Sequence, residues 1–582
     1  MNKITYIAIM LLALASTTVV AQNRKKDTLS TKVVDVVKSY APTIADAEKK
    51  REDAKVKDSL TVKKKQINYT INSVPVASTF VPDKGKAATV KQKVIRGDYQ
   101  DSYIGGGFGM LNTFYADANI TYNLNDNGKA SFLLNHLSSS DEIEEVFPEM
   151  NYSNSSAEIR YDYQSQELLW GINADISRRL HNWYGIRENT FTRNQLRGKV
   201  DDMQQIYFDY GLAGYLQWAN PYFKGLDFSF RGLSDHFESK ELNVKAQPSF
   251  EVPLTDEQKI NANVLVDYYD GSFTRKYNTI NEINNRWMLF GINPSYQMDI
   301  DSLNLKLGVS LMYVDANKSG ESKFKAYPDV EATYTFNENA ILHAGIRSTL
   351  QQNTFEKLTK TNPYLAPIQE IKPTNVQADA FLGINGKVGN DLLYRLQGSY
   401  RQYKEMPLFT TFTETPTIAS EILPYQYYNA FKAIYDDVSD FELLASIGGN
   451  LQDIVTFNFE GKYNSYAARN QREDTAWNLP NVRVSLYTDF KILPNLFAGF
   501  DLFYTGKRYD IDYQLTPAIP EKISLEGYFD LNLHADYTFN KHWQVFLKGN
   551  NLTSQHYKRW AYYPSQGVQI FAGIRYLFSL NN

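Results

Sequence analysis

The chain has 582 residues, no cysteine and a formal net charge of −4. The absence of cysteine excludes disulfide bonds and thiolate metal sites. The weakly acidic balance argues against a nucleic-acid-binding protein, because such proteins carry basic surfaces. Aromatic residues make up 14%, and the 42 tyrosines outnumber the 33 phenylalanines.

Residues 1–21 are typical of a secretory signal peptide. Lys3 supplies the positive charge, Ile4–Ala15 is the apolar core, and Val19–Ala21 ends in small residues suited to cleavage before Gln22. This apolar core is too short to span a bilayer, and we expect no transmembrane helix in the rest of the chain. Membrane integration would therefore require strands closed into a barrel.

Residues 22–98 are rich in lysine and poor in aromatic residues. Pro42–Lys57 reads as a short charged helix, and Gln66–Asn72 and Val76–Val81 read as short extended pieces on either side of Pro75. We therefore predict a short N-terminal segment of mixed or helical structure.

From residue 99 to residue 582 the pattern is one of alternating apolar and polar residues. In Val455–Asn464, for example, the aromatic and aliphatic side chains fall on one face and the charged ones on the other. A charged inner face needs water, which favours a wide hydrated barrel. The predicted strands are twenty-two: 102–111, 115–124, 129–137, 154–164, 167–179, 205–218, 224–239, 242–253, 259–273, 286–299, 302–314, 323–335, 340–351, 375–386, 392–404, 441–451, 455–467, 481–490, 496–508, 528–539, 543–550 and 568–578.

The lengths of the connections support this count. Connections from even to odd strands are short, and connections from odd to even strands are mostly long, as expected for periplasmic turns and extracellular loops. The assignment requires Tyr427–Tyr435 to extend a strand outside the membrane. We therefore predict an all-β fold: a transmembrane antiparallel β-barrel of about 22 strands.

The residues contain no catalytic constellation. The seven histidines are scattered without metal-ligand spacing. The glycine-rich run Gly105–Gly109 lacks the Lys-Ser/Thr and the helix of a phosphate loop, so we interpret it as close backbone packing in a strand. We expect no enzyme activity, no catalytic or metal-binding residues and no cofactor.

A basic and aromatic stretch follows the fifth predicted strand. Arginines in partly apolar loops bind anionic or aromatic ligands, and they also contact lipopolysaccharide phosphates. The candidate extracellular ligand loop consists of Arg178, Arg179, Trp183, Tyr184, Arg187, Arg193 and Arg197.

The end of the chain resembles that of TonB-dependent receptors, in which an Asn-Leu-Thr turn precedes a Pro-Gly-Arg-like segment and a final aromatic strand. Ser565–Gly567 stands where Pro-Gly-Arg is usual, and the final aromatic residue lies four residues before the end. The matching residues are Asn550, Asn551, Leu552, Tyr557, Pro564, Gly567 and Phe578. The resemblance implies a 22-strand barrel in the outer membrane of a Gram-negative bacterium, in contact with lipid and lipopolysaccharide.

The resemblance also implies a plug domain of well over a hundred residues. The segment 22–98 is shorter than that, so the resemblance implies that it is a short periplasmic segment or a reduced plug. A TonB-box-like stretch in that segment comprises Asp27, Thr28, Leu29, Ser30, Val33 and Val34. The first functional hypothesis is energised uptake of a nutrient or chelate with TonB as partner. The alternative is a plug-deficient barrel that acts as scaffold or partner in a surface, assembly or export complex, for instance with a surface lipoprotein. A passive porin and a secreted β protein remain as further alternatives.

Overall fold

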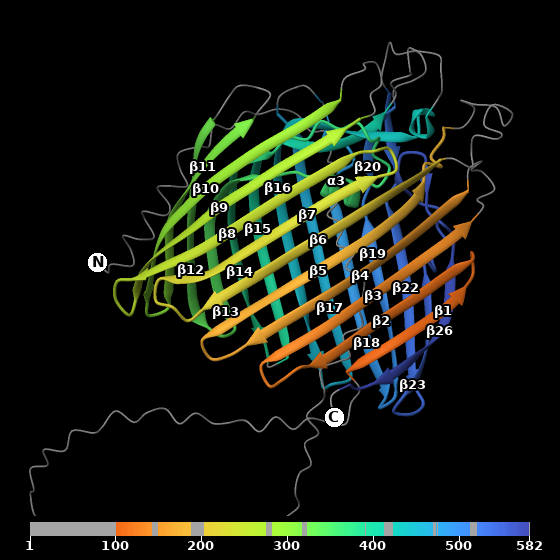
Figure 1. Ribbon diagram of the computed structural model, residues 1–582, viewed down its shortest axis with the longest axis horizontal. Helices are drawn as coiled ribbons and strands as arrows, with labels where there is room; N and C mark the ends of the chain where they lie inside the picture. Colours follow the sequence, from red (N-terminus) through yellow and green to blue (C-terminus); the bar gives the residue numbers. More distant parts are fainter. Residues whose placement is uncertain are drawn as a thin grey trace, which may run out of the picture.

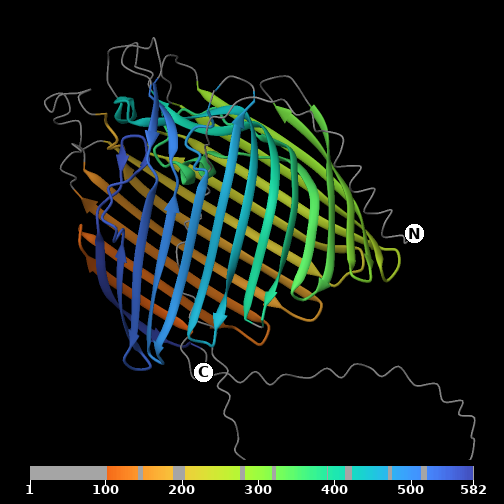
Figure 2. The same ribbon diagram turned by 180° about the vertical axis from the view of Figure 1, so that it is seen from behind.

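The computed structural model describes residues 101–141, 149–187, 203–274, 282–316, 323–389, 391–412, 423–469, 473, 475–512 and 521–580. The predicted signal peptide, the segment 22–98 and the TonB-box-like stretch lie outside these residues. The described chain forms one closed antiparallel barrel of 22 strands, with all strands tilted in the same sense (Figure 1). Figure 2 shows the opposite wall of the same barrel.

The strands of the first half of the wall are β1 (Ser102–Gly109), β2 (Thr113–Asn123), β3 (Gly128–Asp141), β4 (Met150–Gln164), β5 (Leu168–Asn182), β6 (Gln204–Trp218), β7 (Phe223–Asp235), β8 (Lys240–Pro253), β9 (Gln258–Phe273), β10 (Ile283–Ile300) and β11 (Leu303–Ala316). Those of the second half are β12 (Lys323–Asn337), β13 (Ala340–Gln351), β14 (Thr374–Val388), β15 (Leu392–Phe412), β16 (Ala430–Leu451), β17 (Val455–Ala468), β18 (Val482–Leu493), β19 (Leu496–Thr505), β22 (Tyr528–Thr538), β23 (Trp543–Asn550) and β26 (Gln569–Phe578). Each strand pairs with its neighbour in this order, and β26 pairs with β1 to close the ring.

The predicted strand count of twenty-two is confirmed, and so is the extension of a strand beyond the membrane. β15 and β16 run past the neighbouring strands, and Phe412 at the end of β15 pairs with Ala430 at the start of β16. The nineteenth predicted strand is too long: β19 ends at Thr505. Arg508 instead begins β20 (Arg508–Asp512), which pairs with β21 (Glu521–Leu525) in a separate hairpin, in a connection that we expected to be a plain loop.

The outer face of the wall carries the apolar side chains, as the alternation predicts. Exposed aromatic residues gather at both ends of the strands, where the amphipathic girdles of a membrane barrel lie. Those near the short turns are Trp218, Tyr222, Phe250, Tyr334, Phe336, Tyr537, Phe539, Trp543 and Tyr576. Those near the long loops include Phe108, Phe114, Phe208, Phe290, Tyr313, Phe324 and Phe441. The barrel therefore spans a membrane, with its long loops on the extracellular side.

The seam between β26 and β1 is closed by large side chains that lie over glycine. Gly105 pairs with Arg575 on one side and with Asp117 on the other. Because Gly105 has no side chain, the Arg575 guanidinium crosses β1 and binds Asp117, with Nη2 and Oδ2 2.9 Å apart. A Cβ atom on Gly105 would lie 2.5 Å from Arg575 Cγ. Close backbone approach, which we predicted for the glycine run, occurs at Gly107, whose Cβ position lies 2.5 Å from Ala572 O, while Gly105 makes room for a side chain.

Ion pairs line the inner face elsewhere. Arg401 on β15 binds Asp379, Asp440 and Glu442 on its two neighbouring strands, with distances of 2.8–3.2 Å. Such pairing satisfies the charges that the alternation directs inward, and it makes the lumen wall polar. In the described part of the chain no helix is long and apolar enough to cross a membrane.

Candidate functional site

The largest buried apolar cluster of the barrel lies at its extracellular mouth. Two segments fold inward there: a strap, residues 352–373, between β13 and β14, and a hairpin formed by β24 (Lys558–Trp560) and β25 (Tyr563–Pro564). We call the strap, the hairpin and the outer ends of β15 and β16 the cap. Both views show the strap helix α3 (Phe355–Thr361) within the outline of the barrel, at the end opposite the short turns (Figures 1 and 2).

The strap begins with a helix because its sequence supplies a helix N-cap residue, Thr354, and two apolar residues at helical spacing. The Thr354 side chain accepts a hydrogen bond from Lys357 N, which satisfies a backbone donor of the first turn. Phe355 and Leu358 lie one turn apart and are both buried. The helix therefore turns its apolar face into the cluster.

The helix end of the strap is bound to β5, β6 and β8 by side chains of the wall. Glu241 on β8 accepts hydrogen bonds from Phe355 N and from Glu356 N, the latter at 3.1 Å. Arg179 on β5 is paired with Asp209 at 2.8 Å and also donates to Thr359 Oγ1 at 3.1 Å. We call the contacts that Glu241 and Arg179 make with the strap the latch.

The other end of the strap is held by backbone pairing with β16 and by two side chains of β10. Ala366 N donates to Phe431 O at 2.8 Å, and Phe431 N donates to Tyr364 O at 2.9 Å, so the strap adds a short parallel bridge to β16. On β10, Trp287 Nε1 donates to Ile371 O at 2.8 Å, and Asn285 binds both Gln369 O and Ile371 N. We call this set the anchor.

The cap joins opposite sides of the barrel. Trp183 follows β5 and Asn429 precedes β16, and these strands lie half the ring apart. Asn429 Nδ2 nevertheless donates to Trp183 O at 2.7 Å. Asn429 O in turn accepts a hydrogen bond from the Tyr563 hydroxyl.

Three tyrosines fasten the hairpin to the strap and to β5. The rings of Tyr364 and Tyr563 stack with centroids 3.6 Å apart, and the Tyr184 hydroxyl donates to Pro564 O at 3.0 Å. Burial raises the pKa of Tyr364 to about 12 and raises that of Tyr184 as well. Both hydroxyls therefore stay neutral at physiological pH and add no charge to the apolar cluster.

The residues of the predicted ligand loop are divided by the structure. Arg178 and Arg179 belong to β5 and not to a loop, because β5 extends to Asn182. Trp183 is 0% exposed and Tyr184 is 7% exposed, so both pack inside the cap. Arg187 lies at the end of the described segment, and Arg193 and Arg197 lie outside the described residues. The ligand contact assigned to these residues stays a prediction.

The C-terminal signature shapes the connection that carries the hairpin. Asn551 Nδ2 donates to Gln555 O and to Gln566 O, which ties the two ends of this connection together. Asn551 has a φ of 48°, a left-handed conformation that asparagine tolerates. The Tyr557 hydroxyl donates to Asp530 at 2.8 Å.

The remaining signature residues lie along the same connection and its flanking strands. Asn550 binds Gln569 at 2.9 Å between β23 and β26, and Leu552 packs over Gly549. Pro564 accepts the Tyr184 hydrogen bond, Gly567 lies beside His556, and Phe578 pairs with Ser102 at the seam. The signature thus serves barrel closure and the cap together.

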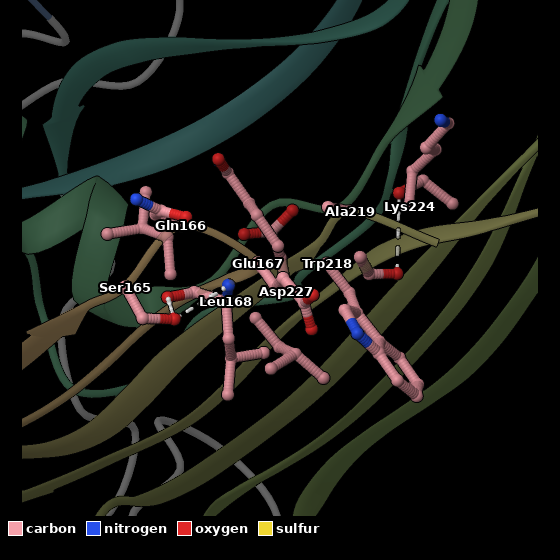
Figure 3. Close-up of a pocket in the computed structure, with 13 residues that line it drawn as sticks. Ser165, Gln166, Glu167, Leu168, Trp218, Ala219, Lys224 and Asp227 are labelled. Atoms are coloured by element: carbon pink, nitrogen blue, oxygen red, sulfur yellow. Dashed lines mark hydrogen bonds between the residues drawn. The ribbon is translucent and has the colours of Figure 1, made fainter. Parts of the chain in front are cut away.

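A recess of about 510 Å³ opens at the opposite, short-turn end of the barrel. Glu167 of the β4–β5 turn, Trp218 at the end of β6, and Lys224 and Asp227 of β7 lie around it (Figure 3). Lys224 binds Glu251 at 3.1 Å. The recess combines charges of both signs, so it does not define an anionic or cationic ligand.

The strap is the element of the mouth that the sequence did not predict. It was expected to be an extracellular loop, and nothing in its composition distinguishes a loop in water from one folded into the mouth. The available signal was local: Thr354 followed by Phe355 and Leu358, a capped helical turn with one apolar face.

Comparisons with known proteins agree with the barrel. No protein-family model and no curated protein matches the sequence. Among solved structures, Pseudomonas aeruginosa FpvA bound to heterologous pyoverdines has 14% identity and a TM-score of 0.57 over 82% of this chain and 71% of that one. The ferric-catecholate import receptor Fiu of Escherichia coli K12 has 11% identity and a TM-score of 0.57, over 83% and 82% of the two chains.

The FrpB iron transporter of Neisseria meningitidis, F3-3 variant, has 11% identity and a TM-score of 0.59 over 83% of this chain and 82% of its own. At such identities the likeness concerns the fold. The chain thus has the 22-strand barrel seen in TonB-dependent receptors, as the C-terminal resemblance implies. With its apolar outer face and aromatic girdles, this barrel belongs in the outer membrane of a Gram-negative cell.

Proposed function

We propose that the protein takes up a nutrient or chelate across the outer membrane, with energy delivered by TonB from the inner membrane. The observation that carries the proposal is the closed 22-strand barrel, which is similar over most of its length to FpvA, Fiu and FrpB. FpvA is seen in complex with a pyoverdine and iron, Fiu is a ferric-catecholate import receptor and FrpB is an iron transporter, which makes a ferric chelate the first substrate class to test. This step rests on fold similarity.

The wide polar lumen supports the same proposal. Inward charges are paired along the wall, as in Arg401 with Asp440 and Lys306 with Asp329 at 2.6 Å. A wall of ion pairs can form hydrogen bonds with a hydrated solute. Because the charges are paired, they do not bind a passing ion strongly. The cap restricts entry from outside, so uptake would require it to rearrange.

Coupling to TonB would use the stretch Asp27–Val34 within the N-terminal periplasmic segment 22–98. Substituting proline for Leu29 and Val33 would prevent this stretch from adding a strand to a partner, since proline lacks the backbone donor. The matched control places proline at Lys91 and Lys93, in the same segment but outside the stretch.

The test compares a deletion strain with strains that restore the full chain, the Leu29→Pro/Val33→Pro variant or the control. Accumulation of radiolabelled ferric chelates is measured at equal amounts of folded barrel. We expect uptake with the full chain and the control, and a loss of at least about tenfold with the proline variant, as for a removed binding step. Equal uptake by the deletion strain for all chelates tested would contradict this substrate class. Co-purification of a surface lipoprotein without uptake would favour the scaffold alternative.

A further inference from the structure

We propose that the cap is a gate that closes the pore from the extracellular side, and that it opens by releasing the latch while the anchor holds. The inference goes beyond the uptake proposal, because it concerns how the barrel is closed whether or not a ligand is transported. It follows from three features of the described residues: the span of the cap, the unequal bonding of the two ends of the strap, and buried polar atoms that lack partners.

The cap joins opposite walls of the barrel at its mouth. Its buried cluster includes Tyr207 and Tyr269 from the β6 and β9 walls, Phe409 and Phe431 from β15 and β16, and Trp560 from the hairpin. The Asn429–Trp183 hydrogen bond joins strands half the ring apart. An apolar layer supported from both sides excludes water from the mouth, and water-filled paths are what conduct ions.

The two ends of the strap are held in different ways. The anchor uses backbone pairing with β16 and two β10 side chains, and it lies next to the point where the strap enters β14. The latch relies on two wall side chains, Glu241 and Arg179. Glu241 is 5% exposed and its acceptor oxygens bind the first turn of α3, so losing these bonds weakens the hold on the helix end without breaking a strand pair. The Tyr207 hydroxyl of β6 still donates to Pro363 O at 3.2 Å. The latch is therefore the end that opens.

The closed arrangement leaves polar atoms unsatisfied. Within the described residues, the buried side-chain atoms of the cap and its contact surface without a hydrogen-bond partner include Asn182 Oδ1, Trp183 Nε1, Gln352 Oε1, Asn362 Nδ2, Thr410 Oγ1 and Trp560 Nε1. Each such atom raises the free energy of the state that buries it. Opening the cap would return these atoms to water. The free energy gained in this way offsets part of the free energy that is lost when the apolar cluster is exposed. Such a balance suits a gate that opens and closes.

The latch can be weakened at Glu241, whose carboxylate also accepts a hydrogen bond from the Tyr269 hydroxyl of β9 at 2.8 Å. Glu241→Leu removes the acceptor and keeps a side chain of similar size. The control Glu251→Gln removes a carboxylate charge near the short turns, where Glu251 binds Lys224 and Lys259. The purified full-length proteins are reconstituted in planar bilayers, and the fraction of time spent in a large-conductance state is recorded without ligand or TonB. Heat-modifiable gel mobility confirms that each barrel is folded.

We expect Glu241→Leu to raise the open fraction at least about tenfold over the full chain, since hydrogen bonds from α3 to a buried acceptor are lost only from the closed state. Glu251→Gln should match the full chain. Equal open fractions in all three proteins would contradict the latch, and a full chain that is permanently open would contradict the gate.

A reversible bridge provides a second test that does not depend on the Glu241 variant. The chain has no cysteine, so a bis-methanethiosulfonate linker would react only with an introduced Arg179→Cys/Thr359→Cys pair. This pair removes the Arg179 contact and should itself show openings. Bridging should suppress them, and reduction should restore them. Openings that persist in the bridged protein would overturn the proposal. Because no ligand or TonB is present, failure here would leave the uptake proposal intact.

Discussion

Replacing Arg575 by methionine is expected to destabilise the barrel by about 3–5 kcal/mol, the range for removing one partner of a buried ion pair. Arg575 and Asp117 are 3% and 2% exposed, and the guanidinium also binds Asp536 at 2.8 Å and Gln544 at 3.2 Å. These contacts link β26 with β2, β22 and β23. The substitution leaves the Asp117 carboxylate buried without its counter-charge.

The free energy of unfolding is measured by urea titration in detergent micelles, with tryptophan fluorescence as signal. The control is Arg347→Met, because the Arg347–Glu331 pair is 53% and 31% exposed and should be worth about 0–1 kcal/mol. The double variant Arg575→Met/Asp117→Asn should recover part of the loss, since the uncompensated charge is removed with its partner. If Arg575→Met and Arg347→Met lower the free energy of unfolding by equal amounts, the buried ion pairs of Arg575 do not stabilise the barrel more than an exposed pair does.

Replacing Gly107 by valine is expected to cost about 3 kcal/mol, the upper end of the usual range for overpacking. A Cβ atom on Gly107 would lie 2.5 Å from Ala572 O and 2.9 Å from Phe546 Cζ. The carbonyl belongs to the paired strand and cannot move without breaking the β1–β26 ladder. Phe546, at 2% exposed, would have to leave its position over the glycines.

The neighbouring residue provides the matched control. Gly106 faces the opposite side of β1, and the nearest atom to its Cβ position is Tyr115 O at 3.6 Å. Gly106→Val should therefore retain the unfolding midpoint and heat-modifiable mobility of the unmodified chain. If Gly106→Val and Gly107→Val unfold at the same urea concentration, the lack of space for a side chain at Gly107 does not determine stability.

The barrel was predictable because a strand in a membrane wall repeats one rule at every position. Residues that face the lipid, such as Phe457 and Phe459, must be apolar, and residues that face the lumen, such as Glu460 and Lys462, are polar and hydrated. The period of two is therefore visible in each strand without knowing which strands pair with it. The alternate short and long connections then fix the order of the strands. The predicted strand was extended too far at β19, because Gly506 and the charged pair Lys507-Arg508 already break the apolar alternation after Thr505.

The cap was not predictable in this way, because its contacts join residues that are far apart in the sequence. Trp183 was read as an exposed ligand contact beside arginines, but it is covered by Phe237 and Tyr425 from two other connections. Aromatic residues in a basic loop have the same local pattern whether they face water or a packed mouth. Glu241 likewise reads as an ordinary polar residue of β8, and only the position of α3 gives it a role.

The most direct test of the closed mouth is the conductance of a barrel without its strap. Gln351 and Thr374 are paired between β13 and β14, so a short turn can replace residues 352–373 without altering the wall. In planar bilayers we expect this variant to conduct steadily, while the full-length protein stays mostly closed. If the barrel without its strap is folded and as closed as the full-length protein, the strap does not close the mouth.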